Sequence, residues 1–382
     1  MKLLPIHPFP ARMAPELVLD ELANLPEGAT VLDPMTGSGT VLRASVERGL
    51  VCAGFDMDPL AVLMAKVWTT KLPDGLEEKA RTIAEAATRL TASDLPPHIA
   101  GSEQTKAFAD FWFEEKQQTE LSALVSLVEM AEEEYRDPLR LAVSRLIVTK
   151  ENGASIARDT SHSRPHRVFF NNKFSVLGSF AIAARRIEQR HRSDLVTGAA
   201  TVALGDARAL PTRDSTYDAV ITSPPYLNAI DYMRGHRLAL IWLGYGLDEL
   251  RTVRSTSIGA ESGQPLSALE LGEAVPDWAH LPARQQMMIN RYANDISALM
   301  AEVRRVLKPS GSALLVVGDS TLNGRYISNA MINVLAAKAA GMSLAGRFER
   351  DLPTGSRYLP VGASDSSLGK RMRTETVLRF AA

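Results

Sequence analysis

Cysteine is nearly absent from this chain of 382 residues, since Cys52 is the only one. A single thiol excludes an internal disulfide and any metal site that needs several cysteines, and we expect no bound metal. Long apolar runs are missing as well: residues 313–318 form one of the longest, whereas about 20 apolar residues are needed to cross a bilayer. Residues 1–12 carry three prolines in place of the apolar core of a signal peptide. We therefore expect a cytoplasmic protein without membrane association.

An excess of charge of one sign is also lacking, because the net charge is −1 with 45% hydrophobic and 23% charged residues. This composition is that of an ordinary globular protein and excludes a uniformly basic nucleic-acid binder. The charges are nevertheless segregated, with a net −9 over residues 74–137 (15 acidic, 6 basic) and a net +8 over residues 139–192 (11 basic, 3 acidic). Either the two blocks pack on one another, or the basic block binds a polyanion.

Strands and helices alternate at both ends of the chain. We predict a buried strand at 30–34, a glycine-rich turn, a helix at 40–48 and a second strand at 51–55. The alternation resumes with strands at 200–204, 217–222, 313–318, 343–350 and 375–380 and helices at 292–307 and 327–340, the first of which is closed by a stop at 308–311. This pattern predicts an α/β protein with a doubly wound, Rossmann-like sheet.

The middle of the chain interrupts this alternation. Residues 74–137 are mostly helical by period, with an apolar face over 119–136, and are followed by a helix at 139–148, a long loop at 151–173 and a helix at 175–192. We therefore predict an inserted, mainly helical subdomain. The resulting division is a first part of the core at 1–70, the insertion at 71–199 and a second part of the core at 200–382, with a variable stretch at 227–288.

The first motif is the run from Asp33 to Thr40, Asp-Pro-Met-Thr-Gly-Ser-Gly-Thr, directly after a predicted strand. It is not a P-loop, which needs a Gly-Lys-Ser/Thr sequence, and it lacks the third glycine of a dinucleotide fingerprint because Leu42 stands there. An acid at the end of the next strand, Asp56, follows Gly39 by 17 residues, about the spacing used to hold ribose hydroxyls. The pattern suits a mononucleoside such as S-adenosylmethionine, and the alternative is a purely structural turn.

The second motif is Thr222-Ser-Pro-Pro-Tyr226, which follows an apolar strand. Two prolines fix the backbone and remove two N–H donors, so that the carbonyls of Ser223 and Pro224 are free to accept hydrogen bonds from an amine. Tyr226 adds a flat ring for stacking a base. Two acceptors on the hydrogens of an exocyclic amine localise its lone pair and aim it at a methyl donor. The alternative is a loop that merely ends in two prolines.

Together the motifs resemble the S-adenosylmethionine-dependent amino methyltransferases of DNA, particularly the N4-cytosine type. The resemblance covers residues 5–68 and 200–382, and it implies that S-adenosylmethionine is bound and released as S-adenosylhomocysteine, without a metal. It implies a catalytic tetrapeptide of Ser223, Pro224, Pro225 and Tyr226. It also implies that Asp56 holds the ribose, that Asp206 holds the adenine amino group and that the segment around Phe9 covers the methionine end. The cofactor-binding residues are then Pro8, Phe9, Pro10, Asp33, Pro34, Thr36, Gly37, Gly39, Thr40, Asp56, Met57, Asp206 and Ala207.

The order of the motifs and the first residue of the tetrapeptide refine this resemblance. The cofactor motif precedes the catalytic one, which excludes the permuted arrangement and places a target-recognition region between them, although residues 227–288 are a second candidate for it. Serine in the first position of the tetrapeptide favours cytosine N4, since adenine N6 enzymes more often carry Asp or Asn there. Methylation at cytosine C5 needs a thiolate, and we expect Cys52 to be buried.

The basic block supplies residues for a DNA partner, because phosphate contacts need cations and base contacts often use arginine. We expect one group in the loop at 151–173 and a second before the last strand. The predicted DNA-binding residues are Arg158, Arg164, His166, Arg167, Lys173, Arg357, Lys370 and Arg371.

The leading hypothesis is a site-specific methyltransferase acting on the N4 amine of cytosine in double-stranded DNA, as a monomer or dimer, with or without a cognate restriction endonuclease. Such an enzyme flips its target base out of the duplex. Methylation of adenine N6 in DNA is the first alternative, and an RNA amine is the next. A DNA-binding regulator with a vestigial cofactor pocket is the alternative without catalysis.

Overall fold

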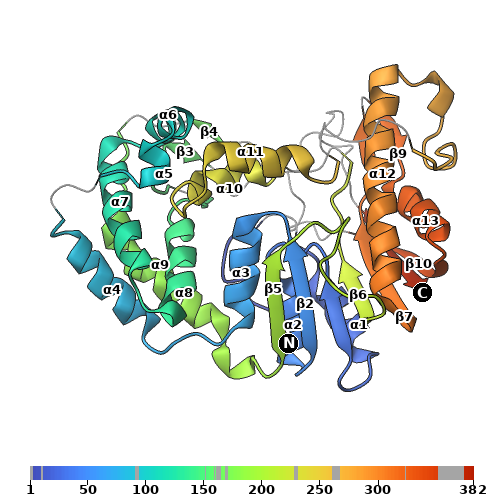
Figure 1. Cartoon of the computed structure of the whole chain (residues 1–382), viewed down its shortest axis with the longest axis horizontal. Coiled ribbons are helices and arrows are strands. Elements are labelled where there is room, and N and C mark those ends of the chain that lie inside the picture. Colours follow the sequence, from blue (N-terminus) through green and yellow to red (C-terminus); the bar gives the residue numbers. More distant parts are fainter. Residues whose placement is uncertain are drawn as a thin grey trace.

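The computed structural model describes residues 3–9, 12–90, 94–150, 152–158, 160, 165–167, 171–227, 231–259, 267–322, 324–351 and 374–382. A seven-stranded sheet forms its centre, with the strand order β10-β11-β7-β6-β1-β2-β5 (Figure 1). The strands are β1 (Thr30–Asp33), β2 (Val51–Asp56), β5 (Ala199–Leu204), β6 (Tyr217–Thr222), β7 (Leu307–Val317), β10 (Ser343–Asp351) and β11 (Thr374–Ala381). Neighbours from β5 to β7 are parallel, and β11 is antiparallel to both β7 and β10.

The direction of winding changes at β1, which lies between β2 and β6. The chain moves from β1 to β2 and β5 on one side, and then crosses to β6 and β7 on the other. At such a switch point the loops after two neighbouring strands diverge and leave a crevice at their carboxyl ends. The predicted doubly wound, Rossmann-like sheet is therefore confirmed, and it places the two motifs on adjacent strands.

Helices cover both faces of the sheet because successive strand residues point to opposite sides. Val31 and Cys52 face one apolar core, whereas Leu32 and Phe55 face the other. The helices of the first core include α1 (Pro15–Ala23), α2 (Thr40–Glu47) and α3 (Pro59–Thr69), and those of the second core include α12 (Ala283–Val306) and α13 (Asn329–Ala339). Cys52 is buried as expected, and burial raises the pKa of its thiol to about 12.

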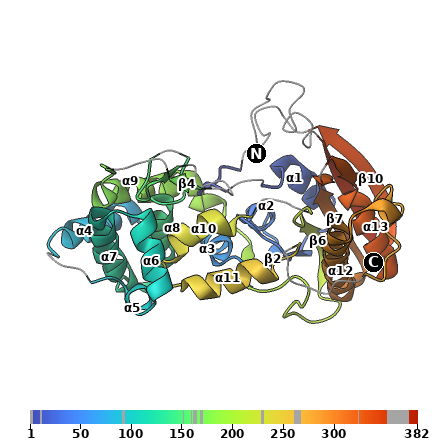
Figure 2. The same cartoon turned by 90° about the horizontal axis from the view of Figure 1, so that it is seen from above.

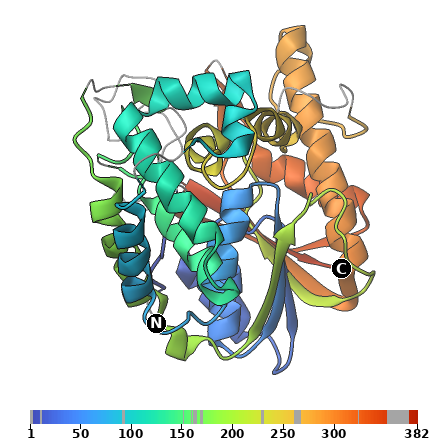
Figure 3. The same cartoon turned by 60° about the vertical axis from the view of Figure 1, so that its left-hand side comes forward.

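A group of helices lies beside the sheet, between α3 and β5 in the sequence (Figure 3). We call these helices the helical block: α4 (Leu76–Ala87), α5 (Pro97–Ala100), α6 (Glu103–Trp112), α7 (Glu115–Glu129), α8 (Glu133–Arg145) and α9 (Val176–His191). The predicted loop at 151–173 holds two short paired strands, β3 (Ala157–Arg158) and β4 (His166–Arg167). The chain segments that enter and leave the helical block lie side by side. Val67 O contacts His191 Nε2 at 2.8 Å, and Leu72 N donates to Ser193 Oγ at 3.2 Å.

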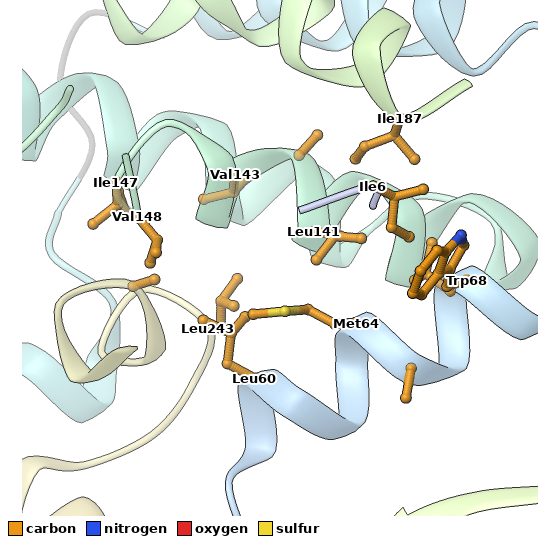
Figure 4. Packing of buried hydrophobic residues seen from close by; sticks show 14 of the residues in the cluster. Ile6, Leu60, Met64, Trp68, Leu141, Val143, Ile147, Val148, Ile187 and Leu243 are labelled. Carbon is orange, nitrogen blue, oxygen red and sulfur yellow. The ribbon is translucent and has the colours of Figure 1, made fainter. Parts of the chain in front are cut away.

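The helical block shares its core with the N-terminal segment and with α3. Figure 4 shows Ile6 beside Ile187, Leu141 and Trp68, which come from α9, α8 and α3. All four side chains are at most 1% exposed. Part of the acidic block also contacts the basic one, because Arg185 lies 3.9 Å from Glu77 and the backbone amides of Asn171 and Asn172 donate to Glu114.

The largest differences from the predicted elements lie in the second half of the chain. Helix α12 begins at Ala283, nine residues before the predicted start, because the apolar residues of its first turns are consecutive (Met287, Met288 and Ile289) and show no helical period. The helix ends at Val306, one residue before its predicted end, and residues 308–311, predicted as its stop, form the beginning of β7 (Leu307–Val317). The pairing of β7 with β6 shifts register between Tyr217 and Ala219. Helices α10 (Met233–Leu240) and α11 (Leu247–Thr256) occupy the stretch at 227–288, which was predicted only as variable, and β8 (Ser320–Leu322) and β9 (Arg325–Ile327) form a small hairpin.

Membrane-spanning helices and metal sites can be searched for only in the described ranges. None of the helices there is both long and apolar enough to span a bilayer. The same ranges hold no group of three or more His, Cys, Asp or Glu side chains placed to bind a metal. The division of the chain at residues 70 and 199 stays a prediction.

Candidate functional site

The glycine loop follows β1 and packs against the end of β2. Thr36 N donates to Phe55 O at 2.9 Å, and Gly37 N donates to Asp56 Oδ2 at 2.8 Å. Gly37 and Gly39 have φ values of 48° and 88°, in the left-handed region that disfavours other residues. The loop therefore packs directly against the acid that the sequence singled out. Burial and the neighbouring Asp58 raise the pKa of Asp56 to about 6.

Gly39 gives a stability prediction, because a Cβ there would lie 2.8 Å from Ala65 Cα on α3, in addition to the strain of φ +88°. We expect Gly39→Ala to lower the free energy of unfolding by about 2–5 kcal/mol, from strain and overpacking together. Urea denaturation measures it. Gly244→Ala is the matched control, since Gly244 has φ +102° but no atom within 4 Å of the added Cβ. Equal losses for the two variants would show that contact with α3 is unimportant.

A buried histidine connects this acid to the segment after the second motif. Asp58 N donates to Asp56 Oδ1 at 2.9 Å, and the Asp58 side chain caps α3 by accepting from Leu60 N at 2.9 Å. Its other oxygen lies 2.5 Å from His236 Nδ1 on α10. Helix α10 is thereby anchored at the end of β2, next to Asp56.

Phe9 covers the glycine loop. Its ring would be 3.2 Å from a Cβ on Gly37, and its centroid lies 5.1 Å from that of Tyr232 and 5.6 Å from that of His236. The segment is held by α8 of the helical block, because His7 Nε2 lies 2.8 Å from Ser144 Oγ and the Arg145 guanidinium donates to Ile6 O. His7 is buried, as a packing residue rather than a ligand, and burial lowers its pKa.

Two polar atoms at this place are buried without a hydrogen-bond partner among the described residues. They are Ser38 Oγ, in the glycine loop, and His236 Nε2, whose ring lies against Phe9. An unpaired buried polar atom costs about 1–3 kcal/mol. A ligand that offered complementary polar groups here would remove that cost.

The second motif is tied to the first by one side-chain hydrogen bond. Thr222 Oγ1, at the end of β6, donates to Asp33 Oδ1 at 2.8 Å, and both residues are buried. Burial raises the pKa of Asp33 to about 7, against the lowering effect of this hydrogen bond and of the Met35 amide. The turns after β1 and β6 are therefore in contact at the switch point of the sheet.

The Ser223 side chain hydrogen-bonds to the backbone of β7, and it also interacts with the Tyr226 hydroxyl of the same tetrapeptide. Ser223 Oγ donates its proton to Val316 O at 2.8 Å, which leaves the oxygen lone pairs as acceptors. Two further hydrogen bonds hold the backbone of this turn: Tyr292 OH donates to Pro225 O at 3.1 Å, and Ser320 Oγ donates to Leu227 O at 2.7 Å. Tyr226 is partly buried, and burial raises the pKa of its hydroxyl.

Asp206 stands one strand further along the same edge, two residues after Leu204, which pairs with Asp56. Its carboxylate is held by Arg208 at 2.7 Å, and Arg208 reaches Asp295 at 2.6 Å. Burial opposes ionisation, but the hydrogen bonds from Arg208 outweigh it, so the pKa of Asp206 lies below its ordinary value. The side chain remains one-third exposed.

The structure thus brings most of the predicted cofactor and catalytic residues to neighbouring turns at one edge of the sheet. The predicted residues Pro10, Arg164, Arg357, Lys370 and Arg371 lie outside the described residues. Sequence reasoning missed Ser38, Asp58, Tyr232 and His236. Ser38 sits inside the glycine motif and could have been named from it, whereas the contacts of His236 join residues 178 positions apart.

The described basic residues form a separate group on the helical block. Arg158 pairs with His166 across β3 and β4, and the Arg167 guanidinium lies 5.0 Å from the centre of the Phe111 ring on α6. Lys173 is exposed. These strands lie on the side of the molecule toward which β2 and β5 point (Figure 1).

Comparisons with known proteins give distant similarities. No protein-family model matches the chain. The chain is 21% identical to the Type II methyltransferase M.MvaI of Kocuria varians over 361 residues, covering 83% of this chain and 76% of that protein. It is 25% identical to the Type II methyltransferase M.BsoBI of Geobacillus stearothermophilus over 278 residues, covering 63% of this chain and about half (52%) of that protein.

Among solved structures, a SAM-dependent methyltransferase from Methanosarcina mazei aligns over 97% of this chain and 98% of its own. The identity is 9% and the TM-score is 0.36. These values are too low to bear on function, and the fold assignment above rests on the strand order of this chain.

Proposed function

We propose that this chain transfers the methyl group of S-adenosylmethionine to the exocyclic N4 amine of cytosine in DNA. The observation that carries the proposal is the hydrogen bond from Thr222 to Asp33, 2.8 Å long, which joins a glycine-loop cofactor motif to an amine-binding Ser-Pro-Pro-Tyr turn at the switch point of the sheet. A donor site and an acceptor site are then adjacent. The similarity to two Type II methyltransferases supports a methyltransferase acting on DNA.

The residues at the glycine loop fit S-adenosylmethionine. Gly37 and Gly39 allow a ligand to approach the backbone, and the carboxylate of Asp56 is placed to accept from ribose hydroxyls. Phe9 supplies an apolar cover, and the unpaired Ser38 Oγ supplies a polar contact. Asp206, ionised beside Arg208, is the acceptor for the adenine amino group.

The tetrapeptide acts on the target amine. Bound S-adenosylmethionine supplies a methyl group on a sulfonium, and sulfur leaves with the electrons of the S–CH₃ bond as the neutral thioether of S-adenosylhomocysteine. Ser223 Oγ and the Pro224 carbonyl accept the two amine hydrogens, which turns the nitrogen lone pair toward the methyl carbon. The nitrogen forms the new N–C bond and then loses one proton to solvent. Tyr226 stacks on the flipped base.

The choice of cytosine N4 rests on the resemblance described above, in which serine at the first position of the tetrapeptide, here Ser223, favours cytosine N4. Serine offers one oxygen whose proton is already donated to Val316 O, so it meets the amine as a neutral acceptor. The runner-up is adenine N6 in the same DNA, which the same turn would hold in the same manner.

Nucleoside analysis tests the proposed function. The protein is incubated, in separate reactions, with duplex DNA and with RNA, each with S-adenosylmethionine carrying a labelled methyl group, and the nucleic acid is digested and its nucleosides are separated by liquid chromatography with mass detection. Label in N4-methylcytosine is the expected result. Label in N6-methyladenine would replace the base assignment, and label in RNA but not in DNA would replace the substrate. Tight DNA binding without transfer to any nucleic acid would favour a regulator.

The raised pKa of Asp56 predicts a pH dependence of cofactor binding. The carboxylate is the strong acceptor, and the free protein holds it with a pKa of about 6. Affinity for S-adenosylhomocysteine should therefore be constant above about pH 7 and fall as the pH drops through 6, by about tenfold at pH 5. Calorimetric titration at several pH values measures it. Asp33, Asp58 and His236 lie nearby, so Asp56→Asn is the control and should bind weakly with a flatter profile. A wild-type affinity that does not change down to pH 5 would contradict the prediction.

A further inference from the structure

Four arginines gather on the two helices that follow the tetrapeptide. Arg234 and Arg237 are one turn apart on α10, and Arg251 and Arg254 are one turn apart on α11. The side chains of Arg234, Arg251 and Arg254 are 39%, 54% and 45% exposed. We call these four residues the arginine cluster.

The charge of the arginine cluster is only partly compensated. Arg234 Nε and Arg254 Nε share a single oxygen of Asp231, at 2.9 and 2.5 Å, and Arg251 contacts Asp248 at 3.1 Å. Within the part of the chain that the structure describes, four guanidinium groups therefore face two carboxylates. The other acid of α11 is Glu249, which together with burial raises the pKa of the Tyr245 hydroxyl.

Arg237 lies at the inner side of the cluster. Its guanidinium lies 4.9 Å from the centre of the Phe108 ring, and its Nε is buried without a hydrogen-bond partner among the described residues. Burial lowers its pKa, and the nearby Arg254, Arg234 and Arg251 add to that effect against Asp231. The cations thus repel one another, and a bound anion would relieve the repulsion.

The two helices lie beside the candidate site. The Arg208 guanidinium, which holds Asp206, also donates to Thr256 O at 2.5 Å at the end of α11. Helix α10 is anchored to Asp58 through His236. Figures 1 and 2 show both helices at the end of the sheet toward which β2 points. A polyanion lying on the cluster would therefore pass next to the candidate site.

Helix α6 connects the arginine cluster to the predicted basic loop. The Arg237 guanidinium lies over the ring of Phe108. Three residues later on α6, the ring of Phe111 lies under the Arg167 guanidinium from β4. The beginning of α11 is also bound to α6, because Leu247 N donates to Thr105 Oγ1 and Arg251 donates to Gln104. The two basic groups, far apart in the sequence, are thus neighbours on one side of the molecule.

We infer that Arg234, Arg237, Arg251 and Arg254 bind the phosphate backbone of double-stranded DNA beside the target base. This inference rests on the proposed function for the position of that base. Arginine is suited to the role because its planar group binds phosphate oxygens with two parallel hydrogen bonds. Contacts of this kind fix the register of the duplex without reading sequence.

The test is the salt dependence of DNA binding, measured by fluorescence anisotropy of a labelled duplex over a range of KCl concentrations. Arg251→Ala plus Arg254→Ala should weaken binding and reduce the slope of log K against log [KCl] by about 0.9 per lost phosphate contact, or about 1–2 in total. The affinity for S-adenosylhomocysteine should not change. Arg251→Lys plus Arg254→Lys should keep most of the slope, because the charge remains.

The matched control is Arg81→Ala plus Arg185→Ala. These two exposed arginines lie on α4 and α9 of the helical block, and both contact Glu77. This control changes the net charge equally and should leave the slope as in the wild type. A wild-type slope in the α11 variant, or an equal loss in the control, would overturn the inference, and so would binding to RNA but not to duplex DNA. If the wild type binds DNA with the predicted dependence on the cluster yet transfers no methyl group, the proposed function fails and this surface stands.

Discussion

Replacing Ser223 by alanine should lower the rate of methyl transfer by about 10²- to 10³-fold, with cofactor affinity unchanged. The hydroxyl donates to Val316 O at 2.8 Å, so its oxygen is fixed and can only accept from the target amine. That acceptor counts most when the amine nitrogen becomes tetrahedral, and an interaction confined to the transition state appears in the rate constant. The magnitude is that of a lost oxyanion-hole donor, about 2–4 kcal/mol.

Single-turnover methylation with saturating DNA and cofactor measures this effect. Ser320→Ala is the control, since it deletes a hydroxyl that holds the same loop from behind through Leu227 O. If both variants lose the same activity, the loss reflects the position of the loop rather than an acceptor at the amine. A Ser223→Ala enzyme with the wild-type rate would place the acceptor elsewhere.

Replacing Asp56 by alanine should raise the Kd for S-adenosylhomocysteine by about 30- to 1,000-fold. Two charge-assisted hydrogen bonds to the ribose would be lost, at a cost of about 2–4 kcal/mol. The Gly37 amide would also lose its partner, which it reaches at 2.8 Å. The affinity for DNA should not change, because the Asp56 carboxylate accepts from the Gly37 and Asp58 amides and not from the guanidinium groups of the arginine cluster.

Calorimetric titration with S-adenosylhomocysteine gives the Kd of each variant. Asp56→Asn separates the two causes, because an amide oxygen can still accept from the Gly37 amide but carries no charge. A strong loss in both variants assigns the effect to the carboxylate. Wild-type affinity in Asp56→Ala would remove this residue from the cofactor site.

The sequence predicted those parts of the molecule whose signals are local. An apolar run followed by Gly37 and Gly39, or by Pro224 and Pro225, marks the end of a buried strand, and the structure has β1 and β6 at these places. The order of strands and helices then fixes which ends meet, because parallel strands present their carboxyl ends at one edge. This is why the sequence alone predicts that the two motifs lie together.

The unpredicted parts depend on contacts between distant residues. His236 and Asp58 are separated by 178 positions, and His7 and Ser144 by 137. No periodicity reports such pairs. The arginine cluster was missed for a related reason: each of its helices carries two arginines, and only packing joins them. The predicted DNA-binding loop around Arg158 stays a prediction.

The position of the helical block has a consequence for the order of folding. Strands β2 and β5 are neighbours in the sheet, yet residues 57–198 separate them in the chain. At about 5–20 residues per second, β5 leaves the ribosome about 7–28 s after β2. Until the block folds and brings Val67 and Leu72 to His191 and Ser193, the edge of β2 has no partner. That open edge, like the edge of β1 that later pairs with β6, is exposed to pairing with other chains, and a chaperone that shields it should raise the yield of native protein.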